Sequence, residues 1–118
     1  INTPSATASQ KSIYKQVFLR RSRAIATSGD YRNYIEIEGK RYSHIINPRT
    51  GYPTESGIVS ATVLTLNCMA ADALATALMV MSPQEGLAMI ERLPDTEAMV
   101  IIQDEDGNFA DLKTKRIP

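Results

Sequence analysis

A helical segment built almost entirely of apolar residues constrains this chain more than any other feature. Residues 68–81 read CMAADALATALMVM, Asn67 stands where a helix cap is expected, and Leu74, Leu78 and Met81 form one apolar stripe. A helix that is apolar on nearly every side is expected to be buried on nearly every side. The rest of the chain must therefore supply elements that pack around this helix.

Strand and hairpin patterns flank the helix on both sides. Segments rich in β-branched and aromatic residues alternate with turn residues, and Gly39-Lys40 sits between two of them as a hairpin turn. A second helix is predicted from Ser82 as cap, with Pro83 at its first position and Glu85 completing a capping box, to about residue 93. We predict strands over residues 13–19, 24–26, 34–38, 41–46, 58–66, 98–103 and 109–112.

This order of strands, helices and strands indicates an α+β fold, because hairpins replace regular βαβ alternation. We expect an antiparallel or mixed sheet packed on the buried central helix and a second short helix. Residues 1–118 form a single region, in which residues 1–12 are predicted to be a mobile leading segment because they are rich in Ser, Thr, Ala and Gln.

Charge and cysteine content exclude several classes of function. Lys and Arg number 13, as do Asp and Glu, and this balance argues against a nucleic-acid binder. No apolar run approaches the ~20 residues of a membrane-spanning helix. The single cysteine, Cys68, rules out an internal disulfide and any multi-cysteine metal site, and its apolar surroundings predict a small buried residue.

Asp72 and Thr76 are the polar exceptions within the apolar helix. They lie four residues apart and so share one helix face. A carboxylate and a hydroxyl are hard oxygen ligands suited to Mg²⁺. The alternatives are an exposed helix edge or the helix N-terminus for Asp72, and a bond to its own helix backbone for Thr76. The residues alone leave these readings evenly balanced.

Residues 43–53 are predicted to contain the end of a strand and the stiff polar loop that follows it. Pro48 restricts Asn47, Gly51 supplies a left-handed or close-approach position, and His44 is the only histidine of the chain. His44 can act as a general base, as a hydrogen-bond donor to a ligand, or as a satisfied half-buried side chain. Arg49 can pair with a phosphate or lie in solvent.

Three motifs in this order resemble one family. They are ATSGDY at residues 26–31, GKRYSHIINPRTGYP at residues 39–53 and ADALATAL at residues 71–78. Together they are similar to the C-terminal part of the FAD:protein FMN transferases, the ApbE-type flavin transferases once described as thiamine biosynthesis lipoproteins. The resemblance covers most of the chain from about residue 24 onward.

The resemblance implies Mg²⁺-dependent transfer of the FMN moiety of FAD to a Thr or Ser hydroxyl of an acceptor flavoprotein, with release of AMP. It places the metal at Asp72 and Thr76 and gives His44 a proton-handling or diphosphate-side role. It also implies that residues from three segments line the nucleotide. These are Thr27, Ser28, Gly29, His44, Pro48 and Thr50.

The resemblance also implies an acceptor protein and a cellular location, and it leaves two alternative functions open. The expected acceptor belongs to a membrane redox complex, and the parent protein is expected to be a lipid-anchored protein on the periplasmic side of the bacterial inner membrane. Asn47 stands where the family usually has Asp, and the family's N-terminal half is absent from this chain. An FAD pyrophosphatase that yields AMP and FMN, and a non-catalytic flavin-binding or interaction module, are the alternatives.

Overall fold

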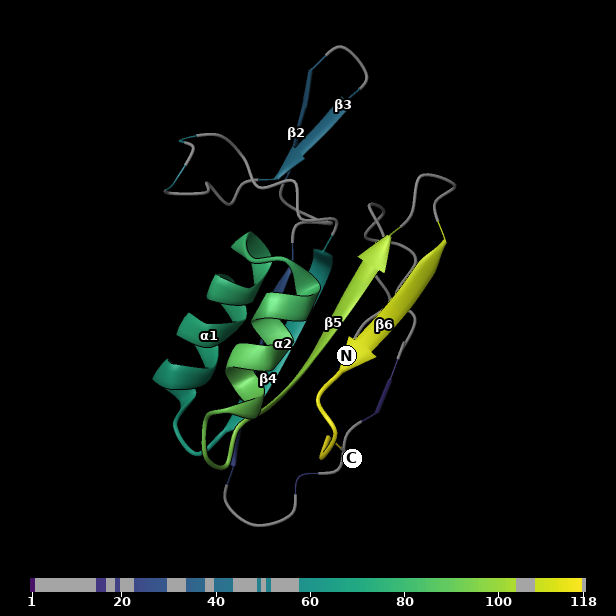
Figure 1. The fold of residues 1–118 in the computed structure, drawn as a ribbon. Coiled ribbons are helices and arrows are strands. Elements are labelled where there is room, and N and C mark those ends of the chain that lie inside the picture. The colour runs from purple at the N-terminus through teal and green to yellow at the C-terminus, as the bar shows by residue number, and fades with distance from the viewer. Residues whose placement is uncertain are drawn as a thin grey trace.

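We describe the fold from a computed structural model, in which residues 1, 15, 16, 19, 23–29, 34–37, 40–43, 49, 51, 58–103 and 108–117 are described. Figure 1 shows the elements in chain order: β1 (Ala24–Gly29), β2 (Tyr34–Ile37), β3 (Lys40–Ser43), β4 (Ile58–Thr65), α1 (Cys68–Val80), α2 (Pro83–Glu91), β5 (Glu97–Gln103) and β6 (Phe109–Lys113).

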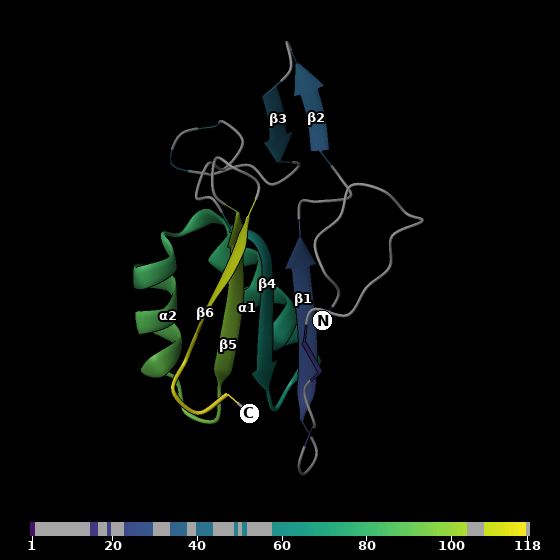
Figure 2. The ribbon, with the colours of Figure 1, turned by 90° about the vertical axis from the view of Figure 1, so that its right-hand side faces the viewer.

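The larger sheet is antiparallel throughout and has the strand order β1-β4-β5-β6. Helix α1 packs over β1 and β4, and α2 packs over β5, so both helices cover the same face of the sheet (Figures 1 and 2). Strands β2 and β3 form a separate two-stranded antiparallel sheet. Both figures show this hairpin beyond the end of the larger sheet. The α+β prediction is confirmed.

The core divides between the two faces of the larger sheet because side chains alternate along each strand. On β5, Ala98 and Val100 face the helices, while Met99 and Ile101 join a second cluster on the opposite face. On β4, Ile58 and Ala61 both contribute to the helix-side core although they are three residues apart. A register shift between Ile58 and Ser60 in the pairing of β4 with β5 accounts for this spacing.

Both predicted helix starts are confirmed by their caps. The side chain of Asn67 accepts a hydrogen bond of 3.1 Å from the backbone N of Ala70, and Ser82 Oγ accepts one of 3.3 Å from Glu85 N. Each cap satisfies a backbone donor that the first turn would otherwise leave unpaired. Helix α2 ends at Glu91, about two residues before the predicted end.

The prediction that the first helix is buried on nearly every side is wrong. Only Ala71, Ala75, Leu78 and Met79 of α1 are buried, whereas Met69 is 79% exposed. Cys68, predicted to be buried, is exposed as well. The physical reason is that α1 packs one face on a single sheet layer and touches α2 on one flank, so its outer side remains in solvent.

The strand predictions differ from the structure mainly at the N-terminal side. β1 continues through Gly29 instead of ending at Ala26, because its pairing with β4 extends from Ala24↔Thr65 to Gly29↔Ser60. In the predicted strand over residues 13–19, the structure describes residues 15, 16 and 19, and these are not in a strand. The strands predicted at 58–66, 98–103 and 109–112 are confirmed with small boundary changes. The predicted hairpin is confirmed by the pairing of β2 with β3, while residues 44–46 of its predicted second strand lie outside the described residues.

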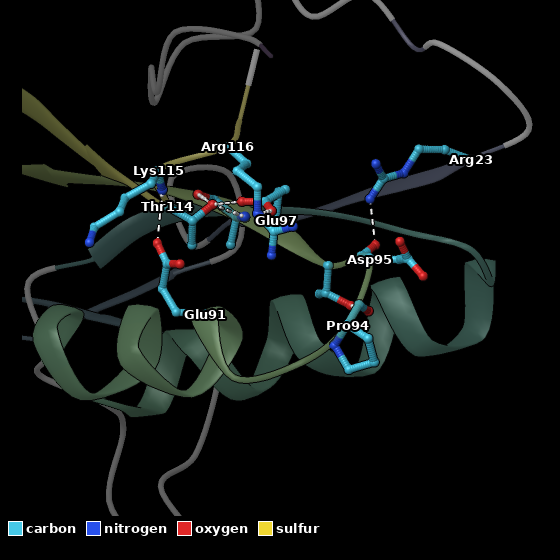
Figure 3. Close-up of polar contacts among 10 residues, drawn as sticks. Arg23, Glu91, Pro94, Asp95, Glu97, Thr114, Lys115 and Arg116 are labelled. Carbon is cyan, nitrogen blue, oxygen red and sulfur yellow. Dashed lines mark hydrogen bonds and ion pairs between the residues drawn. The ribbon is translucent and has the colours of Figure 1, made fainter.

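A buried polar group links the C-terminal residues to the sheet (Figure 3). We call it the Glu97 cluster, and its members are Glu91, Glu97, Thr114, Lys115 and Arg116. Glu97 is only 5% exposed, accepts a hydrogen bond from Thr114 Oγ1 and lies 3.3 Å from Arg116 Nε. Lys115 N donates to Glu91 Oε1 at 2.8 Å, which ties α2 to the same segment. A buried carboxylate requires such partners, because burial of an unpaired charge is costly.

Candidate functional site

Packing of α1 against β1 brings two of the predicted site residues together. Ser28 Oγ lies 3.1 Å from Thr76 Oγ1, although the two residues are 48 positions apart in the chain. Ser28 is on the helix-facing side of β1, as Ala24 and Ala26 are. The contact joins a residue predicted to line a nucleotide with one predicted to hold a metal ion.

Asp72 lies one helical turn before Thr76 on the exposed side of α1. It lies beyond the first turn of the helix, in which there is no acidic residue, so the helix N-terminus does not account for it. Within the described part of the chain, no residue forms a hydrogen bond or ion pair with its side chain. Of the alternatives drawn from the sequence, the exposed helix edge matches its position, and its carboxylate is open to an external ligand.

The donor set at this position fits a magnesium ion in chemical type. Asp72 and Thr76 offer a carboxylate and a hydroxyl oxygen, and both residues are exposed, which leaves room for water ligands. Mg²⁺ is commonly held by one or two carboxylates together with waters and substrate phosphates. The described residues contain no group of three or more His, Cys, Asp or Glu side chains that could form a closed metal site.

Thr27 and Gly29 lie beside Ser28 on β1 but do not share its surroundings. Thr27 Oγ1 is 2.9 Å from Thr62 Oγ1 on the neighbouring strand, on the sheet face away from the helices. Gly29 ends β1 and is paired with Ser60. Of the predicted group Thr27, Ser28 and Gly29, Ser28 is therefore the residue that the structure places against α1.

The predicted site residues His44, Pro48 and Thr50 lie outside the described residues, as does Asn47. Two neighbours in the same loop are described. Arg49 is exposed in a turn, and Gly51 is exposed with φ of 72°, which confirms the predicted left-handed position.

Reasoning from the sequence missed two polar arrangements. The contact between Ser28 and Thr76 has no local signal, because it depends on how β1 and α1 pack. The Glu97 cluster was missed as well. Glu97 is the first residue of β5, and no pattern in the sequence indicated that it would be buried. Its carboxylate is held by Thr114 and Arg116, so the cluster serves the fold and offers little to an external ligand.

The ApbE family model matches residues 1–100 of the chain. The fold, the three motifs and this match together show that the chain belongs to the ApbE family. Among curated relatives, an FAD:protein FMN transferase of Vibrio cholerae is 54% identical over 86 residues, which cover 71% of this chain and 25% of the relative. An FAD:protein FMN transferase of Escherichia coli K12 is 44% identical over 85 residues, covering 72% and 24%.

Solved structures give the same result. The flavin transferase ApbE from Vibrio cholerae matches with a TM-score of 0.70 at 39% identity, covering 98% of this chain and 34% of that one. The ApbE protein of Thermotoga maritima matches with a TM-score of 0.73 at 30% identity, covering 90% and 33%. The chain spans about a quarter of the length of the two curated relatives above.

No helix in the described ranges has the length and apolar character needed to cross a membrane.

Proposed function

We propose that this chain is part of an enzyme that transfers the FMN moiety of FAD to a Thr or Ser hydroxyl of an acceptor protein. The hydroxyl oxygen of the acceptor forms a bond to the phosphorus of the FMN half of the diphosphate. The bond from that phosphorus to the bridging oxygen breaks, and AMP leaves with the bridging oxygen. The proton of the hydroxyl passes to a base on the protein.

The observation that carries this proposal is the meeting of Ser28 and Thr76 beside the open carboxylate of Asp72. It gathers oxygen ligands from two of the three motifs that resemble the flavin transferases. The chain belongs to the ApbE family, and its relatives from Vibrio cholerae and Escherichia coli are named FAD:protein FMN transferase. A phosphoryl-transfer site needs such oxygen ligands, because a cation must offset the charge of the diphosphate.

Each predicted residue has a role in this reaction. Asp72 and Thr76 would hold Mg²⁺, which when bound polarises the diphosphate and stabilises charge on the leaving AMP. His44 would take the proton of the acceptor hydroxyl, since imidazole titrates near neutral pH. The nucleotide would be lined by the β1 end and the loop that follows the hairpin, through Thr27, Ser28, Gly29, Pro48 and Thr50.

The acceptor that we propose is a flavoprotein subunit of a membrane redox complex. We further propose that the reaction takes place on the periplasmic side of the bacterial inner membrane and that the parent protein is anchored there by lipid. These proposals rest on the family resemblance.

The test uses two proteins, since the chain spans a quarter of its relatives. One is the 118-residue chain, and the other is the Vibrio cholerae relative with its matching segment replaced by this sequence. Each is incubated with FAD, MgCl₂ and a peptide that contains one Thr, and intact-mass spectrometry looks for an FMN adduct. The peptide with Thr replaced by Val is the matched control. We expect an adduct and AMP from the chimera.

The outcomes separate the candidate functions. If AMP and FMN are formed without an adduct on the peptide, the activity is hydrolysis of FAD and not transfer of FMN. FAD binding without turnover by the chimera would indicate a non-catalytic flavin-binding module. In the chimera, Asp72→Ala is expected to abolish Mg²⁺-dependent turnover, and full activity of this variant would contradict the metal assignment. His44→Ala is expected to slow transfer more than it weakens FAD binding.

A further inference from the structure

The hydroxyl of Thr76 can bind a cation only if its proton points elsewhere. A neutral hydroxyl has one proton to donate and two lone pairs. When a lone pair faces the cation, the proton needs an acceptor on another side. Ser28 Oγ lies 3.1 Å from Thr76 Oγ1 and can accept it.

Two acceptors compete for this proton. A threonine within a helix can donate to the backbone carbonyl four residues earlier, which here belongs to Asp72. The structure instead records the contact across to β1. Because β1 is held in register by β4 along its whole length, Ser28 offers a fixed acceptor for the hydroxyl of α1.

We propose that Ser28 is a positioning residue, which accepts the Thr76 proton and thereby turns a lone pair of Thr76 toward the cation beside Asp72. This inference rests on the proposed function, since it takes Thr76 as a metal ligand. It goes further by giving Ser28 a role in orienting a metal ligand, in addition to its proposed place beside the nucleotide. Partners of this kind orient metal ligands in many sites, and their loss commonly lowers metal affinity by about 10- to 100-fold.

The test measures Mn²⁺ affinity of the 118-residue chain by electron paramagnetic resonance, with Mn²⁺ as the probe for Mg²⁺. The variants are Ser28→Ala, Ser28→Thr, Asp72→Ala and Thr65→Val. Thr65→Val is the matched control, because Thr65 Oγ1 forms a comparable bond of 3.0 Å with Thr96 Oγ1 in a buried position away from Ser28. Circular dichroism and thermal melts establish that each variant folds.

We expect Ser28→Ala to weaken Mn²⁺ binding about tenfold. Ser28→Thr keeps a hydroxyl and should bind Mn²⁺ as the original chain does, and Thr65→Val should leave the affinity unchanged. Asp72→Ala should abolish it. In the metal-free chain, NMR couplings should show one Thr76 χ1 rotamer, and Ser28→Ala should give rotamer averaging. This second measurement does not depend on metal binding or on activity.

The outcomes distinguish the two proposals. Equal Mn²⁺ affinity of the original chain and Ser28→Ala would overturn the role of Ser28 and leave the metal site intact. A folded original chain that binds no Mn²⁺ would overturn the metal assignment and the inference with it. If Ser28→Thr weakens Mn²⁺ binding as much as Ser28→Ala does, the packing of Ser28 and not its hydroxyl is responsible. This outcome would also overturn the inference.

Discussion

Two polar regions of this molecule use the same kinds of side chain in opposite ways. In the Glu97 cluster, a carboxylate that is 5% exposed is held by Thr114 and Arg116 (Figure 3). On the outer side of α1, Asp72 is exposed, and the described residues give its side chain no partner. The first carboxylate has its hydrogen bonds satisfied within the fold, and the second is open to a ligand. A polar side chain is therefore better judged by its partners than by its type.

The largest expected effect on stability comes from the Glu97 cluster. Glu97→Ala should lower the free energy of unfolding by about 2 kcal/mol, because it removes a buried hydrogen-bond acceptor and an ion-pair partner. Urea denaturation followed by circular dichroism measures this change. Glu91→Ala is the control and should cost less, because Glu91 is exposed. A loss no larger than that of Glu91→Ala would mean that burial of the Glu97 carboxylate does not add to its effect on stability.

The cap of α1 should have an intermediate effect. Asn67→Ala should lower the free energy of unfolding by about 1 kcal/mol, since the backbone N of Ala70 loses its acceptor. Asn67→Asp keeps an acceptor and should cost much less. Thermal unfolding of the two variants checks this expectation. Equal losses would show that the capping bond does not support the helix that carries Asp72 and Thr76.

Asp72 should matter little for stability. Asp72→Asn is expected to change the free energy of unfolding by no more than about 0.5 kcal/mol, as is usual for exposed positions, yet it should remove Mn²⁺ binding. Denaturation and metal titration on the same sample test both parts. A clear loss of stability would show that Asp72 supports the fold, as Glu97 does. The two carboxylates would then not differ in role.

The smallest effect concerns Lys15. Its pKa is lowered from 10.5, first by partial burial and then by the charge of Lys113 and a hydrogen bond to it, while Asp111 acts in the opposite direction. Because the native state disfavours the charged form, this group lowers stability below its folded pKa, and the loss disappears as pH rises toward 10.5.

Lys113→Gln should raise the pKa of Lys15, which would still remain below 10.5 because burial is the largest cause. NMR titration of the Lys15 side chain measures it. An unchanged pKa would show that Lys113 does not act on Lys15, and a full return to 10.5 would show that burial does not.

Much of the fold could be predicted from local patterns. Asn67 and Ser82 cap the helices as predicted, and the predicted hairpins pair through residues 34–37 with 40–43 and residues 99–103 with 109–113. The failures concern what surrounds an element. The composition of α1 predicted burial on nearly every side, but the helix covers only one sheet face, so Met69 and Cys68 are exposed.

The candidate site divides in the same way. Their helical spacing placed Asp72 and Thr76 on one helix face, but a metal site was then only one of several evenly balanced readings. The family resemblance placed the metal there, added Ser28 and gave a role to His44, which lies outside the described residues. The partner of each hydroxyl could not be predicted, because it depends on which strand lies beside which helix.

The helices, the turns, the strand alternation and the family motifs can be read from local sequence, since caps and side-chain periodicity act over a few residues. The contact of Ser28 with Thr76 and the exposed position of Asp72 arise from the way the elements pack together. Those outcomes require β1 to pair with β4 and α1 to pack back across both strands. They depend on contacts between distant residues, which short-range patterns do not encode.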